Sequence, residues 1–583
     1  MPAFSKLADY IENHPSQGLQ LARQFFNRFF DHELISRRGE AGLTLAQILA
    51  LLAVPGFFVP FLLMPRYMAL QFQPPWVRDM ATWFDKCFFL SFAMAVMGFV
   101  TVFEWEALFP DRRDYLILTP LPIRVRTMFA AKIAALCVFL VIFAVDLNAL
   151  SPLMFPLVVM DASPERETLS YAVSFVLAHA TSLLAGCAFI FFFFVALHGG
   201  LANLLSARAF KRVSPYVQLL SLAGSLALLV HFPAVISLLR PLRRGNGLAL
   251  YLFPPAWFLG LYERLLGRSE PVFRTLAGIA ICALAGVVAA SAAAYATSYR
   301  RHTRRSLEAG PSSASAPAWI GTALAGLADR VVVRHPIERA VFYFVGKTLA
   351  RSRKHKLLLA AYLGVGLALV IDGLAAVYAR WGYGGMDHPT FALVSAPLVL
   401  SFFLLAGLRV GFAIPAELRS NWVFQLTECD ERRECLSGVR KAVMVFAILP
   451  LFGSLAPFYV VLWGWQTAAL HTCYGMTLSL ILMELLLLKL RKIPFTCSYV
   501  PGKAHLNTRW VFYLMAFTTY AYSMARLELW MLQSPLRLGV FFGVAFSVLG
   551  GLMAHRNRLQ AGRFALVFEE EPEPVVRTLN LGY

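Results

Sequence analysis

Long runs of apolar residues alternate with short charged segments along the whole chain. A helix needs about 20 apolar residues to cross the ~30 Å hydrocarbon core of a bilayer. Runs of that length predict six spans in the first half, at residues 43–64, 86–104, 127–147, 171–198, 216–239 and 273–297. Six more are predicted at residues 357–379, 391–414, 441–463, 467–490, 511–532 and 535–554. The pattern predicts an all-α polytopic membrane protein with about 12 transmembrane helices in a lipid bilayer.

One further apolar segment, residues 248–265, is interrupted by Pro254 and Pro255. Proline removes a backbone donor, and lipid offers no hydrogen bond in its place. We therefore expect this segment to be re-entrant or interfacial.

Composition agrees with this class, because 58% of residues are apolar and 15% are charged. Soluble domains have about 45–50% apolar and about 25% charged residues. This excludes a soluble enzyme, a secreted disulfide scaffold and a free nucleic-acid binder. The eight cysteines include no CxxC pair, and the chain has no HExxH motif, so no metal or catalytic site is predicted. We expect the solitary His179, His231 and His471 to form hydrogen bonds between helices.

The net charge of +20 is concentrated in alternate loops. Cytoplasmic loops of membrane proteins are rich in Lys and Arg, so the distribution places both termini in the cytoplasm. Loop 240–272 disagrees, because it carries five arginines on the side predicted to be external. The polar N-terminus does not have the pattern of a signal peptide. We expect a multi-pass protein of the cell inner (plasma) membrane.

A weak internal repeat divides the chain into two halves with the same order of elements. Amphipathic basic segments at 21–38 and 339–356 precede the first and seventh spans, and each suits an interfacial helix. The third and ninth spans both begin with a cation, Lys132 and Lys441. We predict a first transmembrane half at 1–300, a flexible linker at 301–338, a second half at 339–556 and a disordered tail at 557–583. Six spans per half would relate the halves by a pseudo-two-fold axis along the membrane normal.

Four ionisable residues in or beside the spans are candidate polar sites: Asp146, Glu484, Arg526 and Glu528. Charges inside a membrane are costly and often functional. A Glu484–Arg526 pair between the tenth and eleventh spans is one interpretation. Structural pairing between helices explains these residues as well as a transport role does.

The segment DRRDYLILTPLPI, residues 111–123, combines charged residues with a short apolar run that two prolines end. It continues as RVRTMFAAK to Lys132 at the start of the next span. This arrangement resembles the ABC-2-type exporter permeases. The resemblance implies a coupling helix that docks on an ATPase subunit, formed by Asp111, Arg112, Arg113, Asp114, Leu116, Ile117, Leu118, Pro120, Pro122 and Arg124. The segments 21–38 and 339–356 would be the elbow helices of that family.

The corresponding segment of the second half, residues 415–441, lacks the proline pair. Its docking candidates are Glu428, Arg432 and Arg433. The resemblance implies a fused full-length permease that serves a separate ABC ATPase, a homodimer that binds the ATP and Mg²⁺. Gly346-Lys347-Thr348 lacks the earlier glycine of a phosphate loop, so we expect no cofactor on this chain and no enzyme activity of its own.

Two other classes of function fit the spans. A secondary transporter coupled to protons or sodium would use the intramembrane charges. A membrane-embedded enzyme acting on lipid would use the arginine-rich loop 240–272 with His231 nearby, although no matching acid is evident. The transported cargo does not follow from the sequence.

Overall fold

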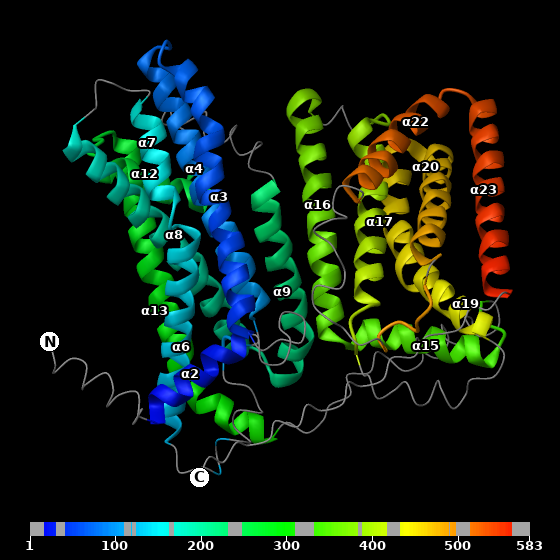
Figure 1. Ribbon diagram of the computed structural model, residues 1–583, viewed down its shortest axis with the longest axis horizontal. Helices are drawn as coiled ribbons and strands as arrows, with labels where there is room; N and C mark the ends of the chain where they lie inside the picture. The colour runs from blue at the N-terminus through cyan, green and yellow to red at the C-terminus, as the bar shows by residue number, and fades with distance from the viewer. Residues whose placement is uncertain are drawn as a thin grey trace, which may run out of the picture. The chain divides into compact units, whose positions relative to one another are not determined.

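The computed structural model describes residues 17–30, 41–105, 107–109, 118, 120, 124–161, 168–230, 248–308, 332–382, 387–416, 432–488, 490–496 and 513–561. Every regular element in these ranges is helical. The chain divides into two units, Met1–Ser312 and Ser313–Tyr583. The boundary falls inside the predicted linker. The chain is an all-α, multi-pass membrane protein (Figure 1).

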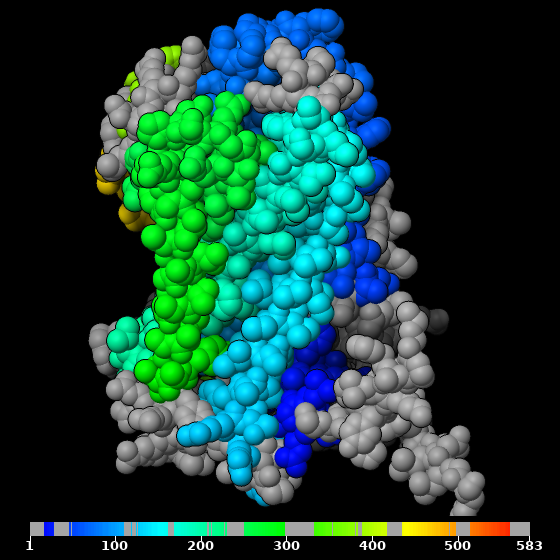
Figure 2. Space-filling model, turned by 90° about the vertical axis from the view of Figure 1, so that its left-hand side faces the viewer, coloured from blue at the N-terminus to red at the C-terminus, as the bar shows by residue number. Residues whose placement is uncertain are grey.

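Unit 1 is built around the long helix α8. Its helices are α2 (Gln17–Phe30), α3 (Ala41–Leu70), α4 (Pro75–Phe103), α6 (Val125–Leu147), α7 (Ser151–Asp161), α8 (Leu169–Leu204), α9 (Ala207–Val230), α11 (Leu248–Leu252), α12 (Pro254–Leu265) and α13 (Pro271–Glu308). Helices α4, α12 and α13 pack directly on α8. Figure 2 shows α13, in green, beside the cyan helices of this unit.

Glycine permits a close contact between two long helices of unit 1. A Cβ atom at Gly199 of α8 would lie 2.6 Å from the Cβ of Ala294 on α13. Small residues at such crossings let transmembrane helices approach, where packing is the main source of attraction. Helices α8 and α13 therefore pack closely against each other.

The double proline of the segment 248–265 begins a helix. Pro254 occupies the first position of α12, where its missing N–H costs no hydrogen bond. Helix α12 has 12 residues, about 18 Å at 1.5 Å per residue, which is too short to cross a bilayer. It packs against α4, α8 and α13, in keeping with the expected re-entrant or interfacial segment.

Unit 2 contains α15 (Pro336–Arg351), α16 (Arg353–Trp381), α17 (Phe391–Gly411), α19 (Arg432–Val443), the π-helical η5 (Met444–Ile448), α20 (Leu449–Leu487), the π-helical η6 (Thr518–Ser523), α22 (Met524–Met531) and α23 (Pro535–Ala561). Helix α15 lies crosswise at the ends of the other helices (Figure 1). Its packing partner is α19. This is the placement expected of an interfacial helix.

The helical stretch Glu434–Leu487 contains two predicted spans. As one straight helix it would be about 80 Å long, far more than a bilayer needs. The backbone leaves the helical region at Gly464, where φ is 77°. The rings of Tyr459 and His471 then pack across the break at 4.5 Å. The stretch is therefore an antiparallel pair of helices, and glycine supplies the positive φ that the turn requires.

Nine helical stretches in the described residues are long and apolar enough to cross a membrane. They include ten of the twelve predicted spans, because Glu434–Leu487 holds two. The predicted spans 216–239 and 511–532 correspond to α9 and to η6 with α22, which fall outside this set. Part of each of these two predicted spans, residues 231–239 and 511–512, lies outside the described residues.

Candidate functional site

A polar cavity of about 230 Å³ lies at one end of unit 1. Its wall is formed by the first turns of α4 and α8, by Val159 of α7, and by the end of α12 with the turn that follows it. Helix α4 contributes Asp79, Thr82 and Lys86, whose spacing places them on one helix face. The helix begins at Pro75, so Lys86 lies about 16 Å along it. The cavity therefore extends from the span ends toward the middle of the unit.

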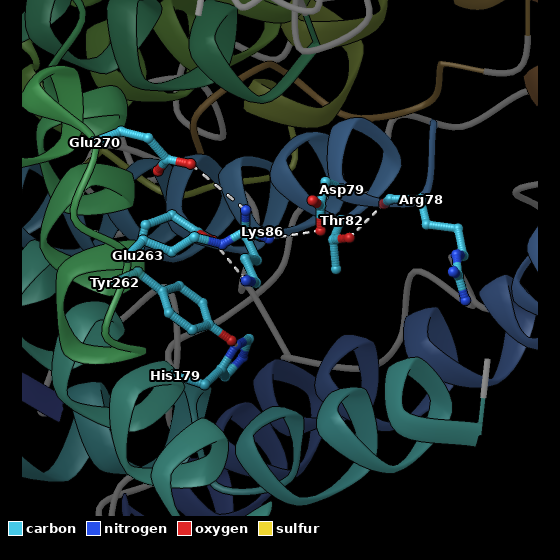
Figure 3. A network of polar contacts seen from close by, with 9 residues as sticks. Arg78, Asp79, Thr82, Lys86, His179, Tyr262, Glu263 and Glu270 are labelled. Carbon is cyan, nitrogen blue, oxygen red and sulfur yellow. Dashed lines mark hydrogen bonds and ion pairs between the residues drawn. The ribbon is translucent and has the colours of Figure 1, made fainter. Parts of the chain in front are cut away.

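A buried ion pair closes the inner end of this cavity (Figure 3). Lys86 Nζ lies 2.5 Å from Glu263 Oε1, and the two side chains are 4% and 0% exposed. The ammonium also lies over the rings of Phe175 and Tyr262, 4.9 and 4.6 Å from their centroids. A desolvated cation gains from such ring faces as well as from the carboxylate. Lys86 thus links α4, α8 and α12.

Arg268 extends the network toward the cavity rim. Its Nη2 donates to Asp79 Oδ1 at 2.6 Å, and its Nε lies 3.4 Å from Glu263 Oε2. Burial lowers the pKa of Arg268, but Asp79 and Glu263 outweigh it and the pKa is raised. Loop 240–272 looked too basic for an external loop. The ion pairs of Arg268 with Asp79 and Glu263 offset part of the positive charge of this loop.

A hydrogen-bonded chain centred on His179 lies beside the ion pair. His179 Nδ1 lies 2.8 Å from the Tyr262 hydroxyl, and its Nε2 lies 3.3 Å from Ser151 Oγ. His179 is fully buried and joins α7, α8 and α12. The prediction that this histidine bonds helices together is confirmed.

Unit 2 contains a second buried cluster, centred on Glu484 of α20. Arg556 Nη1 of α23 donates to Glu484 Oε1 at 2.6 Å, and Arg440 Nε of α19 lies 3.5 Å from Oε2. Arg526 instead lies over the ring of Phe391 at 5.0 Å. The Glu484–Arg526 interpretation was wrong, because helical spacing along one chain does not reveal which helices become neighbours.

The interfacial helix α15 is tied to α19 by the neighbouring cation. Lys441 Nζ lies 2.6 Å from Glu338 Oε1, and Ser437 Oγ donates to the same carboxylate at 2.5 Å. A Cβ atom at Gly438 would lie 2.5 Å from the carbonyl oxygen of Glu338. Only glycine fits there without a shift of backbone, so α15 and α19 are held at close range.

Unit 1 has a comparable contact at the start of α6. Lys132 Nζ lies over the rings of Phe25 and Phe29 on α2, at 4.8 and 5.0 Å. In both units a cation on the helix associated with a predicted docking segment, Lys132 of α6 or Lys441 in the last turn of α19, therefore contacts the preceding interfacial helix. The contact differs in chemistry, with aromatic rings in unit 1 and a carboxylate in unit 2.

The contact between Glu338 and Lys441 is expected to weaken in acid. Burial raises the pKa of Glu338, but hydrogen bonds from Lys441 and Ser437 and the Lys441 charge outweigh it, and the pKa is lowered from 4.5. The stabilisation is complete above the unfolded-state pKa and is lost as the pH falls through the folded-state value. Hydrogen exchange of α15 should accelerate below about pH 4.5. Glu338→Gln should remove this pH dependence, and an unchanged profile would contradict the assignment.

The other intramembrane candidates lie apart from these clusters. Glu528 Oε1 of α22 lies 2.6 Å from His471 Nδ1, and both side chains are 1% exposed. His471 therefore also joins two helices, as predicted. Asp146 is half-buried near the end of α6. The structure does not bring Asp146, Glu484 and Glu528 together within the described parts of either unit.

The predicted docking residues fall mostly outside the described residues: Asp111, Arg112, Arg113, Asp114, Leu116, Ile117, Pro122 and Glu428. Leu118 is half-buried, and Pro120 and Arg124 are exposed. Arg432 and Arg433 form the start of α19. The structure thus describes only the ends of the two predicted docking segments. Their role in docking stays a prediction.

Sequence reasoning missed the network of Asp79, Lys86, Glu263 and Arg268. The predicted span began at Lys86, so the charges before it were assigned to a loop. The spacing of Asp79, Thr82 and Lys86, at i, i+3 and i+7, was the signal in the sequence that these side chains share one face of a helix. In the described ranges, no group of three His, Cys, Asp or Glu side chains is placed to hold a metal ion.

Comparisons with protein-family models, with curated proteins and with solved structures gave no match for this chain.

Proposed function

We propose that this chain is the membrane-spanning subunit of an ATP-driven exporter that works with a separate ATPase chain. One observation supports the proposal most directly. Each predicted docking segment leads into or includes part of a helix, α6 or α19, and a cation of that helix, Lys132 or Lys441, contacts the interfacial helix of the same unit. A force applied to the docking segment would reach the rest of the unit through that helix.

In unit 2 the path of such a force follows adjacent residues. Arg440 contacts Glu484 of α20, which also binds Arg556 of α23. Lys441 contacts Glu338 of α15. Movement of α19 would therefore displace an interfacial helix and two spans together. ATP and Mg²⁺ would bind on the partner, and its closure would supply the movement.

The finer topology belongs to the same proposal. Twelve spans in two repeats, both termini in the cytoplasm and an inner-membrane location agree with the charges of every loop except 240–272 and with the Gly464 turn between two predicted spans. The contact of Lys132 with α2 and of Lys441 with α15 supports the repeat.

The docking claim is tested by changing the apolar run Leu116, Ile117 and Leu118 together to Asp. The loss of one hot-spot residue at a protein interface costs at least about 2 kcal/mol, a factor of about 30 in affinity, and three aspartates would also place charges where interface cores exclude them. The full-length variant should lose co-purification with a P-loop ATPase in mild detergent, and ATPase stimulation should disappear.

Leu169→Asp is the matched control, because this leucine is 83% exposed at the start of α8. It should fold and retain the ATPase. A folded triple variant that still binds the ATPase, or a wild-type chain that purifies without one, would contradict the proposal.

A second candidate function rests on His471 and Glu528. Their contact is buried, and His471 Nε2 and Glu528 Oε2 make no hydrogen bond. Such a pair has the chemistry to bind and release a proton inside a membrane. Transport driven by a pH gradient without nucleotide would favour this candidate over the exporter.

A further inference from the structure

The interfacial helix α15 has a buried face and a basic face on opposite sides. Three fully buried residues form the first face: Val341, Phe342 and Val345. Three exposed cations, here called the basic face, form the second: Arg339, Lys347 and Arg351. At 3.6 residues per turn these cations fall within about a third of the helix circumference, opposite the buried residues. The exposed side of α15 therefore presents positive charge over about 18 Å of its length.

This surplus of positive charge distinguishes α15 from its counterpart in unit 1. The segment 339–356 contains six Lys or Arg residues and no Asp or Glu, whereas 21–38 contains four basic and two acidic residues. The acidic residue of α15, Glu338, is 4% exposed and paired with Lys441, so it does not neutralise the basic face. On α2, the exposed positions beside Arg23 include Gln20, Gln24 and Asn27. The two interfacial helices therefore offer different surfaces to a charged partner.

The basic face lies at the depth where a bilayer presents its phosphates. The apolar stretch Lys354–Tyr378 of α16 begins three residues after Arg351, so α15 ends within one turn of a span. Because α15 lies crosswise to α16 and α17, its whole length stays near that depth (Figure 1). On the same side of the helix, Lys347 Nζ lies over the ring of Tyr343, 5.8 Å from its centroid. Tyrosine is enriched at membrane–water interfaces, and long basic side chains reach from there to the headgroups.

We propose that the basic face of α15 binds the headgroups of anionic phospholipids, of the phosphatidylglycerol class, in the leaflet on which the helix lies. Clusters of four to eight Lys or Arg beside a span attract anionic lipid, and each charge strengthens binding by a factor of about five. An acidic protein surface would also attract cations, but a bilayer surface explains why they line a crosswise helix next to a span.

Bound lipid would also hold the predicted docking helix at the membrane. Lys441 of α19 lies 2.6 Å from Glu338 of α15, and Gly438 lets the two helices approach closely. Lipid that binds α15 therefore positions α19 as well. The inference does not depend on the proposed exporter, because lipid binding is measured without nucleotide and without the ATPase.

The test uses the full chain in a non-ionic detergent. Native mass spectrometry measures the apparent Kd of each added lipid, for phosphatidylglycerol and for phosphatidylcholine with the same acyl chains. The wild type should bind at least one phosphatidylglycerol about tenfold or more tightly than phosphatidylcholine. Raising ammonium acetate from about 50 to about 500 mM should reduce this preference, because ions screen exposed charges.

Lys347→Gln with Arg351→Gln removes two charges of the basic face from exposed positions, so the variant should fold. Its affinity for phosphatidylglycerol should fall about 10- to 25-fold, while its affinity for phosphatidylcholine stays the same. Lys347→Arg with Arg351→Lys keeps the charges and should bind phosphatidylglycerol as the wild type does. Arg23→Gln with Arg274→Gln is the matched control, because it removes two exposed cations from unit 1.

Three results would overturn the proposal. The wild type could show no preference for phosphatidylglycerol over phosphatidylcholine. The control in unit 1 could weaken phosphatidylglycerol binding as much as the double glutamine variant does, in which case net charge explains the preference. The double glutamine variant could keep the affinity of the wild type for phosphatidylglycerol and lose an acidic protein partner instead, in which case the basic face binds protein.

Discussion

Lys86→Met is expected to destabilise unit 1 by about 3–5 kcal/mol, the usual cost of removing one partner of a buried ion pair. The variant leaves the Glu263 carboxylate, which is 0% exposed, without its closest cation. It also removes the ammonium from the faces of Phe175 and Tyr262. The Arg268 Nε, 3.4 Å from the carboxylate, offsets part of the loss and places the effect toward the lower limit. Thermal or denaturant unfolding in a non-ionic detergent measures it.

The double variant Lys86→Met with Glu263→Leu is the informative control. Replacing both charges with apolar groups of similar size is often neutral or stabilising, so it should recover most of the loss. Arg66→Met removes one partner of the Asp85 side chain, which is 9% exposed, but the Tyr67 hydroxyl still donates to that carboxylate at 2.8 Å. That variant should cost less than Lys86→Met, because the carboxylate keeps a hydrogen bond and the lost cation is 46% exposed. A Lys86→Met protein as stable as wild type would refute the importance of the pair.

Glu484→Leu is expected to have an effect of similar size in unit 2, about 3–5 kcal/mol. It would leave Arg440 and Arg556 close together without a carboxylate, and their side chains are only 9% and 17% exposed. Three helices, α19, α20 and α23, lose their common contact. Unfolding in detergent should show the loss. In the proposed exporter, ATPase stimulation should fall even where the variant still binds its partner.

The rescue variant separates charge from packing. Glu484→Leu combined with Arg556→Leu removes the closer cation, 2.6 Å from the carboxylate in the wild type, and should restore part of the stability. Arg558→Leu is a control on the same helix. If Arg558→Leu rescued Glu484→Leu as well as Arg556→Leu does, net charge would explain the result and the cluster would not.

The location of the spans could be predicted because burial in lipid requires a continuous apolar run. The turn between residues 463 and 467 was predicted from such runs, and the structure has its break at Gly464. The beginning of α4 was not predicted correctly. Asp79, Asp85 and Lys86 interrupt the apolar pattern, yet α4 starts at Pro75. Each of these charges has a partner on another helix or turn, and hydropathy along one segment cannot register such a partner.

The sequence by itself determined the class of this protein, an all-α multi-pass membrane protein, because composition and run length decide what lipid can solvate. It also indicated that His179 and His471 would join helices. Only the tertiary structure decided the partners: Lys86 with Glu263, and Glu484 with Arg440 and Arg556. These pairs join residues that are 177, 44 and 72 positions apart. A charge is stabilised by whichever group lies within a few ångströms, and that depends on how the helices pack.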